Sequence, residues 1–381
     1  MSDVYITHLS AFMPNDPVHN DDMEDVLGMV GTKPSRARRL ILRSNGIQER
    51  YYAIDPVTGN TTHTNAQLTG AAVRELVDAE FELRDMQALA CGTSIADQLM
   101  PGHGVMVHGE LGSPPCEVVS MAGVCVAGVS AMKYAYMSVA SGDSEVALAT
   151  GSETASAVMR GNKFASELAV NAQDLERVPE IAFEKDFLRW MLSDGAGAMV
   201  LQSQPRHNGL SLRIEWIMVR SYANEMDACM YSGAEKQADG QLKGWAQYEP
   251  EEWLQQSVFS VKQDVKQLNE HVIHYTVERP LQELVVSKGL RPDDIDHFLP
   301  HYSSKYFRER VYEGMQRADF EIPYDRWFSN LTVKGNTGSA SIYIMLEDLY
   351  RSGDLQAGQK LLCYVPESGR FSTAFILLTV C

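Results

Sequence analysis

The sequence lacks the features of a membrane protein and of a nucleic-acid-binding protein. No run approaches the roughly 20 consecutive apolar residues of a membrane-spanning helix, and the first residues lack the basic and apolar regions of a secretion signal. Acidic residues number 50 against 33 basic ones, so the formal net charge is −17 and the chain repels a phosphate backbone. We therefore expect a cytoplasmic protein with neither membrane insertion nor nucleic acid as a partner.

Motifs for nucleotide and metal cofactors are also missing. The Gly-x-Gly at 102–104 lacks the strand-turn-helix setting of a dinucleotide site, and the chain has no Walker-type Gly-Lys-Ser/Thr run. The pairs His103/His108 and His271/His274 lack the further cysteine or carboxylate partners that a zinc site needs. Six cysteines in 381 residues fit buried free thiols in a reducing compartment. We expect no metal and no cofactor.

What remains is a globular composition with alternating patterns, since 45% of residues are apolar and 22% charged. The predicted order is a strand at 4–10, a helix at 65–79, strands at 88–94 and 116–121, a helix from about 125 and strands at 145–151, 195–203 and 210–220. This order predicts an α/β fold. A long helical region is predicted near 253–288.

The second half of the chain repeats features of the first. Ser-Gly-Asp ends a predicted helix at 141–143 and again at 352–354, and a Leu-Arg turn leads into a strand in each half at nearly the same offset. Cys125 and Asn336 lie equally far before the two Ser-Gly-Asp sequences. We interpret this as an internal duplication, which fixes the architecture.

Cys125 follows a β-like run and precedes a helix rich in small residues. A cysteine at such a strand-to-helix turn is near unpaired amides and the positive end of the helix dipole, which favour a thiolate nucleophile. A buried structural cysteine is the alternative. The small residues predict that this helix packs closely against its neighbours.

His301 and Asn336 also follow strand ends. His301 comes after the apolar run 295–300, and Asn336 lies in a Gly-rich turn before a helix, where a helix cap is a sufficient alternative role. Together with Cys125 they form a coherent set, because a thiolate can hold an acyl group while two neutral donors stabilise a thioester enolate.

The sequence resembles ketoacyl-ACP synthase III of the thiolase superfamily. The resemblance rests on the run 91–154 around Cys125, on LRSNGIQER at 42–50, SDGAGA at 193–198, Leu-Pro-His at 299–301 and GNTGSAS at 335–341. It implies a five-layered α-β-α-β-α fold of two βαβαβαββ halves, which we place at 1–205 and 206–381. It also implies a homodimer, because the PGHG loop of that family reaches toward the partner's acyl pocket.

The resemblance also implies roles for site residues. Cys125 would take an acyl group from a CoA or phosphopantetheine-ACP thioester, and His301 and Asn336 would assist Claisen condensation. The amide of Cys125 and one near Gly369 and Arg370 would form the oxyanion hole.

Departures from the family pattern indicate a subgroup. Ser304 replaces the Asn expected three residues after the histidine, Glu367–Ser372 replaces a Gly-rich turn, and a tryptophan before Arg43 is missing. The sequences His-Tyr-Ser-Ser at 301–304, Glu-Ser-Gly-Arg-Phe at 367–371 and Gly-Ser-Glu-Thr-Ala-Ser at 151–156 look like the ketosynthases that make dialkylresorcinols and stilbenes by cyclising a condensed product to a cyclohexanedione. Glu153 would then be an extra base, its alternative being a strand-end acid held by an amide or an arginine.

The run 33–43 has five basic residues and no acid, although the chain is acidic. Arg38, Arg39 and Arg43 would attract an anionic acyl carrier protein or its pantetheine arm, unless the run is an ordinary solvated helix face. Two other functions stay open: a plain initiating ketoacyl-ACP synthase III, and a non-catalytic ketosynthase-like partner subunit. Retention of Cys125, His301 and Asn336 argues against the second.

Overall fold

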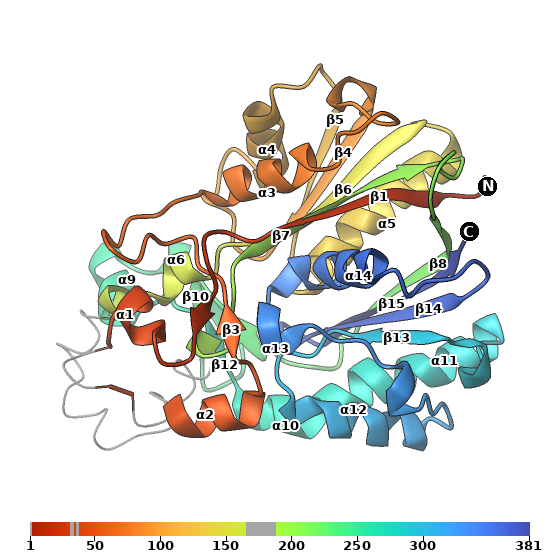
Figure 1. Ribbon diagram of the computed structural model, residues 1–381. Coiled ribbons are helices and arrows are strands. Elements are labelled where there is room, and N and C mark those ends of the chain that lie inside the picture. The colour runs from red at the N-terminus through yellow and green to blue at the C-terminus, as the bar shows by residue number, and fades with distance from the viewer. Residues whose placement is uncertain (1, 31–33, 36–37, 165–187) are drawn as a thin grey trace.

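Nine strands form one continuous mixed sheet, in the order β13-β14-β15-β8-β1-β7-β6-β4-β5 (Figure 1). The structure is a computed structural model that describes residues 2–30, 34–35, 38–164 and 188–381. The strands are β1 (Tyr5–Phe12), β4 (Ala88–Thr93), β5 (Glu117–Ala122), β6 (Val146–Glu153), β7 (Gly195–Gln202), β8 (Leu212–Ser221), β13 (His297–Pro300), β14 (Lys360–Glu367) and β15 (Ser372–Val380). All of them except β14 and β15 lie where the sequence analysis places a strand or an apolar strand-like run.

The strand order of the second half repeats that of the first. β4 and β6 pair in parallel, and β6, β7 and β1 follow as antiparallel neighbours. β13 and β14 are likewise parallel, and β14, β15 and β8 follow as antiparallel neighbours. The halves join where β1 pairs with β8, and the predicted division at 205/206 falls in the connection between β7 and β8.

Helices separate and cover the two halves of the sheet. The larger ones are α3 (Asn65–Arg74), α4 (His103–Leu111), α5 (Val126–Ser141), α10 (Val265–Ile273), α11 (Arg279–Lys288), α12 (Tyr306–Arg317) and α14 (Ser341–Ser352). α5 contacts β4 and β6 of the first half and β14 and β15 of the second, while α14 contacts β1, β7 and β13. α3 and α4 pack on the outer face of the first half, and α10 to α12 cover the second half. The result is the five-layered arrangement that the resemblance implied.

The shorter elements lie in the connections. They are β2 (Val18–His19), α1 (Met23–Leu27), α2 (Arg38–Asn45), β3 (Glu49–Arg50), α6 (Ser156–Met159), β9 (Met230–Tyr231), β10 (Ala234–Lys236), β11 (Leu242–Gly244), α9 (Pro250–Gln255), β12 (Lys262–Gln263) and α13 (Leu331–Lys334). Within the described ranges, no helix is both long and apolar enough to span a membrane.

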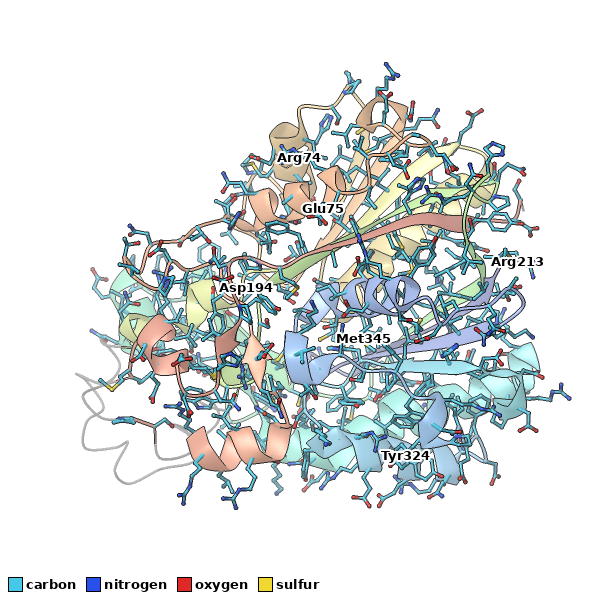
Figure 2. All side chains as sticks on the ribbon, in the orientation of Figure 1. Arg74, Glu75, Asp194, Arg213, Tyr324 and Met345 are labelled. Carbon is cyan, nitrogen blue, oxygen red and sulfur yellow. The ribbon has the colours of Figure 1, made fainter. Side chains whose placement is uncertain are left out.

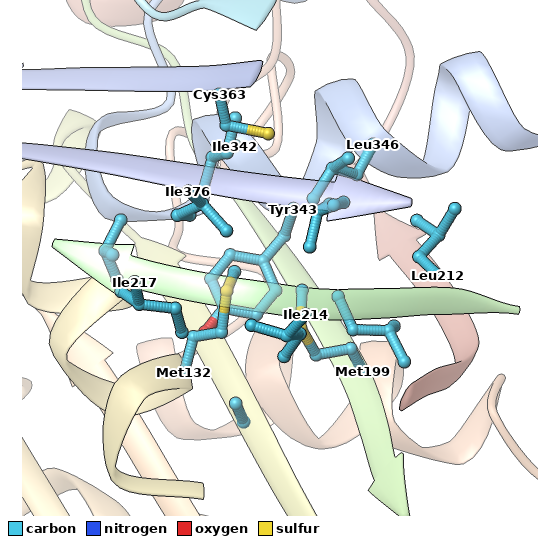
Figure 3. Packing of buried hydrophobic residues seen from close by; sticks show 14 of the residues in the cluster. Met132, Met199, Leu212, Ile214, Ile217, Ile342, Tyr343, Leu346, Cys363 and Ile376 are labelled. Carbon is cyan, nitrogen blue, oxygen red and sulfur yellow. The ribbon is translucent and has the colours of Figure 1, made fainter. Parts of the chain in front are cut away.

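The central layer is held by a buried apolar cluster and by close backbone contact (Figure 3). The Tyr343 ring of α14 lies among Met132, Met199 and Ile376, and its hydroxyl donates to the Gly128 carbonyl of α5 at 2.8 Å. A Cβ on Gly128 would lie 2.2 Å from the Ser339 carbonyl oxygen. The small residues after Cys125 therefore let the beginnings of α5 and α14 meet, as predicted.

The helical region predicted near 253–288 is interrupted. α9 ends at Gln255, and β12 precedes α10, whose first turn is capped by the Asp264 carboxylate accepting from the Gln267 amide at 2.9 Å. A π-helical segment, His274–Glu278, joins α10 to α11. The continuous stretch is thus 265–288, because a capping acid sets a helix start inside the predicted region.

Candidate active site

Cys125 precedes the first residue of α5, in the turn that follows β5. Its side chain lines two cavities, of about 240 Å³ and about 50 Å³. Glu153 and Asn336 line the larger cavity, and His301 lines the smaller one. The structure therefore places the three other residues that sequence analysis singled out for chemistry in the two cavities that Cys125 lines.

Both cavities have mainly apolar walls. The larger is lined by Ile95, Val124, Leu188, Met191, Leu192, Met230, Val261 and Leu268, among others. The smaller is lined by Leu268, Val272, Ile273, Phe307 and Val311 together with Tyr302 and Tyr364. Ser303 and Ser368 line both. Such walls fit acyl chains, whose burial is favourable by about 0.8 kcal/mol per methylene.

His301 is held directly after β13. Its backbone amide donates to the Tyr364 carbonyl at 2.8 Å, which extends the pairing of β13 with β14 by one residue. Burial lowers the pKa of His301 to about 4, because a charged imidazolium loses its hydration there. At neutral pH the imidazole is therefore uncharged and can both donate and accept a proton.

The side-chain oxygen of Asn336 is held by a hydrogen bond, whereas its side-chain nitrogen is not. Its Oδ1 accepts from the Gly338 amide at 3.0 Å, and its backbone amide donates to the Met191 carbonyl at 3.0 Å. Within the described ranges, no acceptor is found for Nδ2. The side chain can therefore present donors to the larger cavity, beyond its role in shaping the turn before α14.

Glu153 is a buried carboxyl group at the end of β6. Its Oε1 accepts from the Ser94 amide at 3.2 Å, the Ser94 hydroxyl at 2.5 Å and the Ser339 amide at 3.0 Å. Burial raises the pKa of Glu153 to about 7, and these hydrogen bonds oppose the rise. A Cβ on Gly338, whose φ is +54°, would lie 2.7 Å from the Glu153 side chain, so only glycine fits beside this acid.

The protonation state of Cys125 differs from the expectation. A helix N-terminus alone favours a thiolate, yet the pKa of Cys125 is raised well above its ordinary value. Burial is the largest cause, followed by the nearby charges of Glu367 and Glu153. The resting cysteine is therefore a thiol.

Glu367 is a site residue that sequence analysis noted only as part of a changed turn. Its Oε2 accepts from the backbone amides of Val124 at 2.9 Å and Val126 at 3.1 Å. These amides flank Cys125. The one feature of the sequence that pointed to Glu367 was an acid at the position where the resembled family has a Gly-rich turn.

The three residues that were predicted for the oxyanion hole or the pocket lie in surroundings that differ from one another. Arg370 is exposed and its Nε donates to the Met226 carbonyl at 2.6 Å. Ser304 is buried and its hydroxyl accepts from the Tyr306 amide at the start of α12, while the preceding Ser303 lines the cavities. Gly369 lies beside the nucleophilic turn, since a Cβ there would be 3.1 Å from Val124.

Asp194 of the SDGAGA motif has a structural role (labelled in Figure 2). Its buried carboxylate accepts from the amides of Ala53 at 2.7 Å and Ser156 at 2.9 Å, and from the Ser156 hydroxyl. Burial raises the pKa of Asp194 to about 6. The motif thus ties three separate segments together near the cavity.

The basic run divides into engaged and exposed residues. Arg38 donates to the Glu24 carboxylate at 2.8 Å and lies over the Trp190 ring at 5.8 Å. Arg39 and Arg43 on α2 are exposed. Of the other basic residues in 33–43, positions 33 and 36 lie outside the described residues.

Known proteins resemble this chain along nearly its full length. A family profile described as 3-oxoacyl-[acyl-carrier-protein (ACP)] synthase III C terminal matches residues 286–377. The curated β-ketoacyl-[acyl-carrier-protein] synthase III of Xanthomonas oryzae is 23% identical over 359 residues, 94% of this chain and 92% of that protein.

Solved structures share the fold. Cerulenin-bound OleA of Xanthomonas campestris superposes with a TM-score of 0.75 at 19% identity, over 99% of this chain and 96% of that one. AbyA1, a tetronic acid condensing enzyme, gives 0.74 at 19% identity over 99% of both chains. The predicted thiolase-like fold is therefore confirmed. In sequence the chain is similar to ketoacyl-ACP synthase III condensing enzymes, and it is an acyltransferase of this kind by class.

Proposed function

We propose that this enzyme joins two acyl units on Cys125 and cyclises the product to a cyclohexanedione, as in the formation of dialkylresorcinol and stilbene precursors. One observation carries the proposal. Glu153 lines the same cavity as Cys125 and Asn336, and its pKa is about 7. A buried carboxyl group poised near neutral pH is the form that general-base catalysis needs.

The first step is acyl transfer. The Cys125 sulfur attacks a thioester carbonyl and forms a new carbon–sulfur bond. The bond from this carbon to the carrier sulfur breaks, and the carrier leaves as a thiol that has taken the proton of the cysteine. The chemistry needs only residues of the chain and its thioester substrates. The apolar walls of the cavities around Cys125 can hold the alkyl part of the acyl group.

Condensation and ring closure follow. Glu153 removes a proton from the carbon between the two carbonyls of a β-ketoacyl thioester, and His301 and Asn336 donate hydrogen bonds to the enolate oxygen. The carbanion adds to the β-carbon of an α,β-unsaturated acyl group held on Cys125, which forms the first carbon–carbon bond, and Glu153 returns its proton to the α-carbon of that acyl group. Glu153 then removes a proton from the carbon on the other side of the ketone, and this carbon attacks the Cys125 thioester carbonyl to close a six-membered ring. The bond from carbon to the Cys125 sulfur breaks, and the proton passes from Glu153 to that sulfur.

A plain initiating synthase is the second candidate. It is favoured by the curated relative of this name, which matches 94% of the chain. That reaction ends after the first carbon–carbon bond, so its product is linear. The two candidates therefore differ in product mass and shape, and both use Cys125.

The test is incubation with a β-ketoacyl thioester and a second acyl thioester, with products identified by mass spectrometry. We expect a cyclohexanedione from the wild-type enzyme and at least about 100-fold slower cyclisation by Glu153→Gln. The wild-type rate should rise as the pH passes through about 7, because only the carboxylate form accepts a proton. A linear product, or equal cyclisation by Glu153→Gln, would refute the cyclase role.

The proposed carrier is an acidic acyl carrier protein. Arg39 and Arg43 are exposed basic residues on one helix of an otherwise acidic chain. Attraction between such charges weakens with ionic strength. Carrier binding that is insensitive to salt would argue against this docking site.

We also propose a homodimer. β5 is an edge strand of the sheet, and apolar side chains near it, such as Leu99 at 71% and Met100 at 85% exposure, face solvent. An unpaired edge beside exposed apolar residues suits pairing with a second copy. Light scattering gives the mass in solution directly.

A further inference from the structure

Glu367 is bonded to the turn that carries the nucleophile. It ends β14 in the second half of the chain, while Cys125 lies in the first half. One carboxylate oxygen accepts from the amides of Val124 at 2.9 Å and Val126 at 3.1 Å. The residue between these two amides is Cys125.

This carboxylate supplies the cap that α5 lacks. The Cys125 side chain forms no capping hydrogen bond, although the first amides of a helix need acceptors. Two glycines lie beside the acid, and the space at Gly369 is the tighter one. A Cβ on Gly123 would lie 3.5 Å from Oε2, and one on Gly369 would lie 3.3 Å from Oε1.

The charges around Cys125 are mainly acidic. Glu153 and Glu367 both raise the pKa of the thiol. Glu153 lines the larger cavity, and the remaining titratable side chains along the two cavities, apart from Cys125 itself, are His301, which is uncharged at neutral pH, and Tyr231, Tyr302 and Tyr364. Among the described residues that line these cavities, none is a lysine or an arginine.

We propose that Glu367 is a positioning residue for acyl transfer, which fixes the turn around Cys125 and keeps the cysteine a thiol until a thioester is bound. This inference rests on the proposed role of Cys125 as acyl acceptor. Since the carboxylate occupies the amides of Val124 and Val126, the Cys125 amide is left to donate to the thioester oxygen. Burial raises the pKa of Glu367, and the hydrogen bonds from the amides of Val124 and Val126 oppose the rise. Glu367 takes up no proton in this step, because the thiol proton leaves with the carrier thiol.

The charge of Glu367 can be tested without turnover. Alkylation of Cys125 by iodoacetamide is followed against pH by peptide mass spectrometry, in the wild type and in Glu367→Gln. The glutamine oxygen can still accept from both amides, but the negative charge is gone. We expect the midpoint of alkylation to fall by about one pH unit, which is about tenfold faster alkylation below the midpoint.

A matched control is Glu145→Gln. Glu145 is an exposed acid that follows the end of α5, whereas Cys125 precedes its beginning, and the 16-residue helix is about 24 Å long. Its removal should leave the midpoint unchanged. A folded Glu367→Gln enzyme with the wild-type midpoint would overturn the inference.

A second variant separates charge from geometry. Glu367→Asp keeps the charge but shortens the side chain, so the midpoint should stay near that of the wild type while the rate of acyl transfer to Cys125 falls at least tenfold. Unchanged acyl transfer would overturn the positioning role. Failure of Cys125 as the acyl acceptor has a different signature, because the wild-type enzyme would then form no acyl adduct with any thioester, whatever the alkylation midpoint. Failure of the cyclase role alone would give a linear product and leave the acyl adduct in place.

Discussion

The two helices that meet at the centre of the molecule begin in different chemical surroundings. α5 begins beside a thiol whose flanking amides are bonded to the Glu367 carboxylate. α14 is preceded by Asn336, whose uncharged side chain accepts from the Gly338 amide, and the Glu153 carboxylate accepts from the next amide, that of Ser339. The strand order around the two helices is the same. The duplicated strand order therefore places the beginnings of α5 and α14 together. The side chains at these two positions differ, so that Cys125 can act as the nucleophile and Asn336 as a hydrogen-bond donor.

The largest expected effect comes from the cysteine side of this comparison. Cys125→Ala removes the sulfur that holds the acyl group, so the acyl adduct should vanish from the intact mass and condensation should fall by at least about 10³-fold. The substitution removes only one sulfur atom from the wall of existing cavities, so the protein should still fold. An adduct that persists in Cys125→Ala would move the nucleophile elsewhere, and no adduct in the wild type would favour a non-catalytic subunit.

Substitution of Asn336 should affect only condensation, the step that follows acylation of Cys125. Asn336→Asp replaces an amide by an acid that repels an enolate, so condensation should fall by about 10²–10³-fold. Acylation of Cys125 should change by less than about threefold, because the first step does not use this donor. Single-turnover mass measurements separate the two rates. Asn208→Asp, at an exposed turn between β7 and β8, adds the same charge and should change neither rate.

The sequence predicted the fold better than the electrostatics of the site. Alternation of strands and helices, with the repeated Ser-Gly-Asp, was enough for an α/β duplication, because these patterns are local. The helix-end argument predicted a thiolate at Cys125, but burial and the charge of Glu367 reverse the direction. Glu367 lies more than 240 residues from its partners in sequence, and no local pattern reveals a contact of that kind.

Ser303 and Ser304 show the same limit at shorter range. Counting three residues from His301 selected Ser304, whose hydroxyl accepts from an amide at the start of α12. Ser303 lines both cavities instead. Spacing from a motif gives a position along the chain, whereas the turn between β13 and α12 decides which side chain points into the cavity.

The smallest expected effect tests the contact between the two helix starts. Gly128 and the turn before α14 approach so closely that a Cβ would lie 2.2 Å from the Ser339 carbonyl oxygen. Gly128→Ala should therefore lower the free energy of unfolding by about 1–3 kcal/mol, measured by the midpoint of urea denaturation.

Gly109→Ala on α4 is the matched control, since a Cβ there has no neighbour within 4 Å and alanine favours a helix by about 1 kcal/mol over glycine. If Gly128→Ala is as stable as Gly109→Ala, the close approach of α5 and α14 is not required. Loss of stability in Gly128→Ala alone, with a slower condensation step in the protein that remains folded, would show that the spacing between the two helix starts sets the distance between nucleophile and donor.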